Sequence, residues 1–261
     1  MLADCHTHLD QYPPQETSAI LERARAAGVT MVAAAGGTVE SSRACVALAR
    51  EHPMVLAGVG IHPMDITGPV DDSSYCQLRE LASSKKVVMI SEVGLDFQEA
   101  RSPRPLQDQV FRAQIRLARE LGLPIVFHTR EADEATLQVL REEAAWQVGG
   151  AWHYFQGSEA QARETLELGF SISLAKPLLR LPHLQQVATR LPLEGIVLET
   201  DAYPQPWKRK RANWTEPKDV RAVAERLAQL RGISLEEVAA ATTTNLRRML
   251  RDRWVGQQAH V

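Results

Sequence analysis

Cysteine is scarce in this sequence, and its cysteines are not arranged in pairs. There are three, Cys5, Cys45 and Cys76, and no Cys-x-x-Cys motif occurs. An odd number of scattered cysteines argues against a disulfide framework and fits a reducing compartment. We therefore interpret the three residues as ordinary thiols.

Long hydrophobic runs are also missing. No apolar stretch approaches the length needed to cross a membrane, and the chain enters its first polar motif at Asp4 without a basic and apolar leader. These absences predict a cytoplasmic protein with no membrane partner. We expect it to be a monomer or a weak homo-oligomer.

Neither sign of charge dominates. The chain has 30 basic and 32 acidic residues. No global field therefore attracts it to a polyanion, so any contact with nucleic acid has to depend on a local basic patch. The overall charge leaves the class of partner open.

What the sequence does contain is an alternation of short β-branched runs with amphipathic helical stretches. At 261 residues and 44% hydrophobic content, the chain can bury one large core. Eight such repeats predict an α/β fold, a single (β/α)8 TIM-like barrel domain over residues 1–261, with an open doubly wound sheet as the alternative. The predicted strands are residues 2–8, 29–35, 55–61, 87–92, 124–128, 151–153, 170–174 and 196–201.

Side chains that can bind a metal recur at the ends of these predicted strands. His6 and His8 point to the same face of the first strand, because side chains alternate along a strand. In a barrel, the carboxyl ends of the strands meet at one face, where active sites lie. We therefore predict that six metal ligands converge there: His6, His8, Glu92, His128, His153 and Asp201.

Six nitrogen and oxygen ligands exceed the four of one tetrahedral zinc ion, so they predict two divalent ions, such as zinc or manganese. Neighbouring cations need an anionic bridge, and Glu92 is the best-placed candidate. The expected chemistry is hydrolysis by a metal-activated water, with Glu92 and Asp201 as catalytic residues and Asp201 as a base. Taken singly, each side chain could instead be a hydrogen-bonded core residue or a helix cap.

Cations interleaved with aromatic residues follow the eighth predicted strand. Trp207 and Trp214 flank this basic loop, whose composition suits a phosphate backbone with stacked bases; a solvated surface loop is the alternative. The cations of the loop are Lys208, Arg209, Lys210 and Arg211.

Two further residues are candidate substrate contacts. The guanidinium fork of Arg130 matches phosphate oxygens, although a salt bridge to a loop carboxylate is its alternative role. His62 ends the third predicted strand on the face of the site and can contact substrate or support a ligand, with a plain loop role as the alternative.

Several motifs in order now identify a resemblance. They are Asp4-Cys5-His6-Thr7-His8-Leu9-Asp10, Gly60-Ile61-His62-Pro63, Ser91-Glu92-Val93-Gly94-Leu95-Asp96, Phe127-His128-Thr129-Arg130 and Leu198-Glu199-Thr200-Asp201. Their order and spacing resemble the TatD family of metal-dependent hydrolases. The resemblance implies a TIM-like barrel, one to three divalent metals and, in many members, a magnesium- or manganese-dependent deoxyribonuclease, often a 3′ to 5′ exonuclease. Matched position by position, it implies the same six metal ligands.

The sequence departs from the family pattern at two places. The sixth-strand motif commonly reads His-Cys-Phe-Ser-Gly, whereas this chain has Tyr154 and Gln156 at the second and fourth positions. After Asp201 the family usually has Ala-Pro or Ser-Pro and then Arg-Asn-x-Pro, whereas this chain has Ala202-Tyr203-Pro204 and the stretch 211–217. These changes affect the substrate side more than the ligands.

Three hypotheses follow. The leading one is a metal-dependent deoxyribonuclease of the 3′ to 5′ exonuclease type, which acts on DNA. The second is a metal-dependent amide, ester or lactone hydrolase that acts on a small molecule, favoured if the loop closes over a small pocket. The third is a metal-binding protein without turnover, which the complete set of ligands disfavours.

Overall fold

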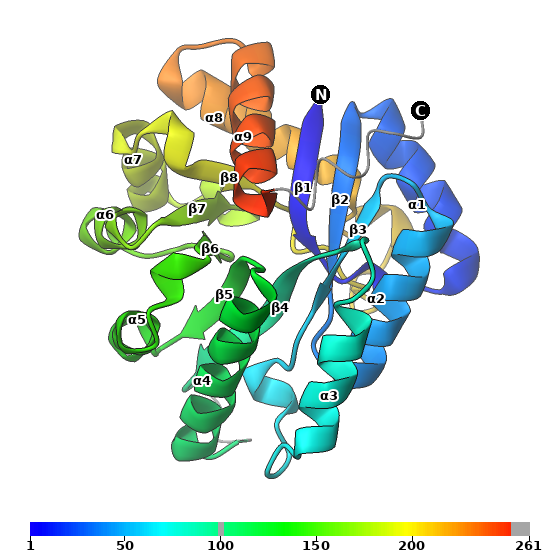
Figure 1. Cartoon of the computed structure of the whole chain (residues 1–261). Coiled ribbons are helices and arrows are strands. Elements are labelled where there is room, and N and C mark those ends of the chain that lie inside the picture. Colours follow the sequence, from blue (N-terminus) through cyan, green and yellow to red (C-terminus); the bar gives the residue numbers. More distant parts are fainter. Residues whose placement is uncertain (99–101, 252–261) are drawn as a thin grey trace.

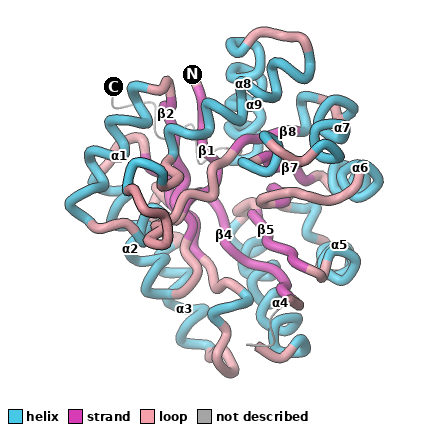
Figure 2. The backbone as a smooth tube through the Cα atoms, turned by 180° about the vertical axis from the view of Figure 1, so that it is seen from behind, coloured by secondary structure: helices cyan, strands magenta, loops and turns pink. Residues whose placement is uncertain are grey.

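The computed structural model describes residues 1–98 and 102–251. Eight strands form one sheet in sequential order, and every paired neighbour is parallel. The strands gather at the centre and the helices surround them (Figures 1 and 2). The strands are β1 Leu2–Thr7, β2 Val29–Ala35, β3 Val55–Val59, β4 Val87–Asp96, β5 Ile125–Arg130, β6 Gly150–Trp152, β7 Phe170–Leu174 and β8 Ile196–Leu198.

Helices follow the strands and cover the outside of the sheet. Amphipathic periodicity in each helix buries one apolar face against the strands, which produces a continuous outer core between the two layers. The helices are α1 Pro14–Ala26, α2 Val39–Glu51, α3 Asp72–Leu81, α4 Arg104–Leu121, α5 Asp133–Glu142, α6 Glu159–Glu167, α7 Pro182–Arg190, α8 Val220–Arg231 and α9 Leu235–Leu250.

The sheet closes between its first and last strands at the carboxyl end. Thr7 and Ala202 form a parallel bridge, and the His8 N–H donates to the carbonyl oxygen of Ala202 at 2.8 Å. The Asp201 N–H donates to the carbonyl oxygen of His6 at 3.1 Å. The closure therefore fixes Asp201 beside the two histidines of the first strand.

The amino end of the barrel is filled by the last helix. Leu246, Met249 and Leu250 of α9 belong to the same buried cluster as inward-facing strand residues such as Ala3 and Met31. Figure 1 shows α9 beside β1 and β8. The barrel interior is thus a packed core that α9 covers at the amino end, and in this architecture active sites lie at the carboxyl face.

The predicted barrel is confirmed, and the differences lie at strand ends. The predicted fourth strand ends at residue 92, but β4 continues to Asp96 because Val93 and Leu95 remain buried. Gly94 permits this, since a Cβ at its φ of 147° would collide with the carbonyl oxygen of His128 on β5. Conversely, β3 and β8 end earlier than predicted, at Val59 and Leu198. The residues that follow these two strands no longer pair with the sheet and lie near the candidate site.

Within the described ranges, none of the helices has the length and apolar character required to cross a membrane.

Candidate metal centre

A single buried carboxylate lies at the centre of the carboxyl face. Glu92 of β4 is only 3% exposed, and an imidazole nitrogen from each of five histidines lies 3.0–3.4 Å from one of its oxygens. We call Glu92, these histidines and Asp201 the Glu92 cluster. The histidines are His6 and His8 beside Oε2, and His62, His128 and His153 beside Oε1.

Hydrogen bonding alone does not account for this arrangement. A carboxylate offers about four lone-pair sites, and four of the five nitrogens lie at 3.4 Å, beyond the usual N–H···O range of ~2.7–3.2 Å. The Nε2 atom of His6 is buried and has no hydrogen-bond partner within the described part of the chain. Imidazole nitrogens and carboxylate oxygens that converge in this way fit divalent cations.

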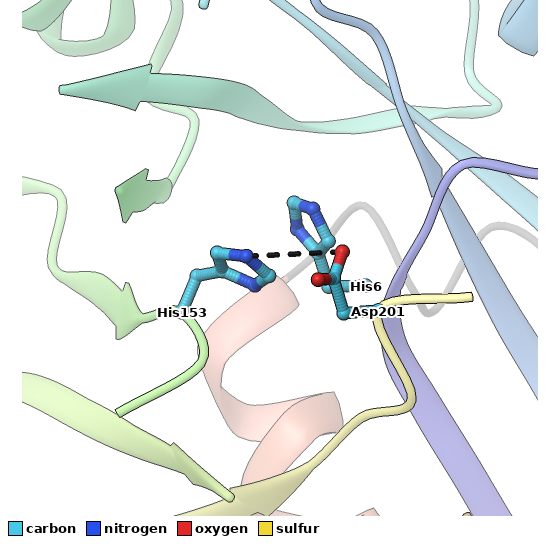
Figure 3. Close-up of side chains that lie close together, drawn as sticks. All are labelled: His6, His153 and Asp201. Atoms are coloured by element: carbon cyan, nitrogen blue, oxygen red, sulfur yellow. Dashed lines mark ion pairs between the residues drawn. The ribbon is translucent and has the colours of Figure 1, made fainter. Parts of the chain in front are cut away.

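The possible ligand atoms separate into three groups, each within 4.8 Å. Two groups share Glu92, one through Oε2 with His6 and His8 and the other through Oε1 with His128 and His62. The third combines His6 and His153 with Asp201. Figure 3 shows these three side chains pointing toward one another, with His153 Nε2 3.9 Å from Asp201 Oδ1.

Two buried carboxylates orient His128 of β5 and His153, which follows β6. Nε2 of His128 lies 2.9 Å from Asp96 Oδ2, and Nδ1 of His153 lies 2.9 Å from Glu199 Oε1. Burial alone would lower the pKa of both rings, but these carboxylates and Glu92 outweigh it and raise the pKa of His128, and that of His153 to about 9. In a metal-bound histidine, a carboxylate in this position would accept the ring N–H and leave the opposite nitrogen, which here faces Glu92, as the ligand atom.

His62 differs from the other histidines in its tautomer. Its Nδ1 accepts a hydrogen bond from the Met64 N–H at 3.1 Å, so in a neutral ring the proton resides on Nε2. That Nε2–H faces Glu92 Oε1 at 3.4 Å. His62 thus directs an N–H toward Glu92 from beyond the usual hydrogen-bond range, although its position alone would also suit a ligand.

Electrostatics keep the two acidic residues of the cluster ionised. Burial by itself would raise the pKa of Glu92, but the surrounding imidazoles, His62 and His153 foremost, hold it well below its ordinary value. For Asp201, burial is likewise outweighed by His8 and His153, and its pKa falls to about 2. Burial and the neighbouring His153 lower the pKa of His6, which favours its neutral form.

All six residues predicted as ligands are brought together. Asp96 and Glu199, both 0% exposed, stand in the quoted motifs, but no role at the site was predicted for them. Strand alternation contained a signal for Asp96, because it follows Glu92 by four residues on one strand and so shares its face. Glu199 also accepts the Tyr154 N–H at 2.7 Å, which holds Tyr154 at a φ of 50°.

Some of the cations predicted to contact substrate are bound by other residues of the protein, and others are exposed. Arg211 donates to Glu16 at 2.7 Å and to Glu216 at 2.9 Å, and its guanidinium stacks over Trp214. Lys208 donates to Gln205 Oε1 at 2.6 Å and to the Asn213 carbonyl at 2.9 Å. These contacts tie the loop to itself and to α1.

Among the described residues, Arg209 and Lys210 are exposed and form no ion pair. Arg130 is paired with Asp96 Oδ2 through Nε at 2.9 Å and Nη2 at 2.7 Å, so its alternative role as a salt bridge is observed. Its side chain nevertheless remains 43% exposed.

Comparisons with known proteins agree with this geometry. Residues 3–251 match the family model described as TatD related DNase. The chain belongs to the TatD family of metal-dependent hydrolases. This confirms the resemblance found in the sequence.

Individual relatives cover nearly the whole chain. It is 35% identical over 258 residues to the uncharacterized metal-dependent hydrolase YabD of Bacillus subtilis, covering 96% of this chain and 99% of the relative. It is 32% identical over 241 residues to the 3′-5′ ssDNA/RNA exonuclease TatD of Cronobacter sakazakii, covering 88% and 90%. The crystal structure of YjjV, a TatD homologue of Escherichia coli, superimposes with a TM-score of 0.85 at 28% identity, covering 95% and 97%.

The buried Glu199 provides a test of how the site is supported. Glu199→Gln keeps the volume but removes the anion that fixes the His153 tautomer, so we expect metal affinity to fall about 10- to 100-fold. Isothermal titration with manganese measures this. The control is Glu236→Gln, an exposed residue in the first turn of α9, which should bind metal like the wild type. Equal affinity in both variants would contradict this role of Glu199.

Proposed function

We propose that this protein is a divalent-metal-dependent deoxyribonuclease of the 3′ to 5′ exonuclease type. The observation that carries the proposal is the division of the two Glu92 oxygens between separate sets of histidines, which suits a carboxylate bridge between two ions. The family and the exonuclease named among the relatives support the phosphodiester substrate.

The proposed ligands are the six that the sequence indicates. Glu92 is proposed as the bridge, with two ions and up to three, of zinc, magnesium or manganese. Such ions would lower the pKa of a water to produce a nucleophile and offset charge on the phosphoryl oxygens. The proposed ligand set is His6, His8, Glu92, His128, His153 and Asp201.

The other polar groups receive roles that follow from their contacts. Asp201 is ionised at neutral pH, so it can accept a proton from a water bound beside it. Its Oδ1 lies 3.3 Å from Nε2 of His8, which places such a water next to both side chains. The Nε2–H of His62 can donate to a phosphate oxygen. Arg130 can contact phosphate with the part of its guanidinium that Asp96 leaves free.

The nuclease assay with a charge-removing variant tests this proposal. Purified protein is incubated with 3′-labelled and 5′-labelled single-stranded DNA and magnesium, manganese or zinc in turn. We expect metal-dependent digestion with early release of the 3′ label. Glu92→Gln should reduce the rate about 100-fold or more and lower the metal content, because residues that only orient a ligand already contribute 10- to 100-fold.

Circular dichroism should show an unchanged fold in Glu92→Gln, and Glu236→Gln should digest DNA at the wild-type rate. Full activity and normal metal content in Glu92→Gln would refute the bridging role. No digestion of DNA with any metal, together with hydrolysis of a small ester or amide, would favour the small-molecule hydrolase instead.

The two exposed cations of the basic loop, Arg209 and Lys210, lead to a separate prediction. The double variant Arg209→Ala and Lys210→Ala should weaken single-stranded DNA binding and flatten its salt dependence by about 1.4 in log K against log[salt], for two lost phosphate contacts. Arg50→Ala, an exposed residue near the C-terminus of α2 and hence at the opposite face, should change neither.

In contrast, Arg211→Ala should mainly lower the free energy of unfolding, because Glu16 and Glu216 would each lose a cationic partner, although Glu216 keeps Arg23. Chemical denaturation measures that loss. An unchanged salt slope in the double variant would show that the two exposed cations do not contact the strand.

A further inference from the structure

Two aromatic side chains form a row of ring contacts that begins at His8 of the Glu92 cluster and ends at the surface. The ring of Tyr203 lies 6.5 Å from that of His8, centroid to centroid, and the ring of Trp207 lies 5.9 Å from that of Tyr203. Tyr203 is partly buried, whereas Trp207 is 66% exposed. Burying so large an aromatic side chain would stabilise the fold, so its exposure at this place is not explained by folding.

The segment that carries the two rings is held firmly. Its start is fixed where Ala202 bridges Thr7 of β1. Further along, the buried Gln205 accepts from the Thr215 N–H at 3.0 Å and from Lys208 Nζ at 2.6 Å. Prolines at 204 and 206 restrict the backbone on either side of Gln205. The rings are therefore presented by an ordered segment, which reduces the entropy lost when they contact a ligand.

We propose that Tyr203 and Trp207 form a stacking seat for the bases of a single strand whose scissile phosphate lies at the Glu92 cluster. This inference rests on the nuclease function proposed above and identifies the side from which the strand reaches the site. Aromatic faces stack every base, so such a seat binds single strands with little sequence preference.

The distribution of charge also favours the Tyr203–Trp207 side of the cluster for a DNA strand. The exposed Arg209 and Lys210 lie two and three residues after Trp207. A pocket of about 390 Å³, which His8, His62 and Glu92 of the cluster also line, includes the carboxylates of Asp10 and Asp65, and no lysine or arginine is among its described lining residues. A polyanion is favoured over the cationic side and disfavoured over the acidic one. The acidic pocket suits an uncharged sugar or base at the end of the strand.

The test compares strands with and without bases. The metal-loaded enzyme is titrated with a fluorescent, phosphorothioate-linked oligothymidylate that resists cleavage, and with an abasic strand of the same length and linkage. We expect Trp207→Ala and Tyr203→Leu each to weaken binding of the oligothymidylate about fivefold to 100-fold, and to weaken binding of the abasic strand far less. Trp207→Phe, which keeps an aromatic face, should retain most of the affinity.

Trp146→Ala is the matched control, because Trp146 is 52% exposed but precedes β6 at the amino end of the barrel. It should bind both strands like the wild type. Equal losses for the two strands in Trp207→Ala, or no loss, would overturn the stacking seat.

The outcomes separate this inference from the proposed function. If the wild type digests DNA but the aromatic variants bind oligothymidylate normally, the stacking seat is wrong and the nuclease stands. If the wild type neither binds nor digests any polynucleotide with any metal, both are wrong.

Discussion

The structure depends on one buried anion. Placing Glu92 at 3% exposure would be very costly without compensating charge, and the chain surrounds it with imidazoles instead of lysine or arginine. Imidazoles can release their protons and offer lone pairs, which a guanidinium cannot. The same residues can therefore hold the anion as protonated partners or hold cations beside it as neutral ligands. The buried Asp96 and Glu199 orient two of the rings in either state, and because they raise the pKa of those rings, metal ions would have to compete with protons for them.

The barrel provides the geometry that this arrangement needs. Members of the Glu92 cluster from β1, β4 and β5 meet those that follow β6 and β8 because all parallel strands end at one face. The closure between Thr7 and Ala202 places Asp201 next to the β1 histidines, and the plug formed by α9 fills the opposite end. Asp201 adopts a φ of 50°, a conformation that aspartate tolerates better than most residues. A departure from regular backbone thus occurs at a residue whose direction matters for the site.

Periodicity and strand-end position were sufficient to predict the barrel and the convergence of six side chains. Helix starts also carry a sequence signal: Ser234 and, three residues later, Glu237 form a capping box at the start of α9. Contacts between segments that are distant in the sequence could not be predicted from it. No local pattern reveals that Glu199 lies against His153, or that Arg211 is occupied by Glu16, because these pairs form only when the barrel closes. The tautomer of His62 likewise depends on a backbone N–H two residues away that only the folded loop presents.

The most direct test of this account is the position of bound metal. Crystals grown with manganese, measured at the manganese absorption edge, give an anomalous difference map that locates each ion without assumptions. The account predicts two maxima that share Glu92, one on the side of His6 and His8 and the other on the side of His128. A single ion, or ions that do not contact Glu92, would contradict it.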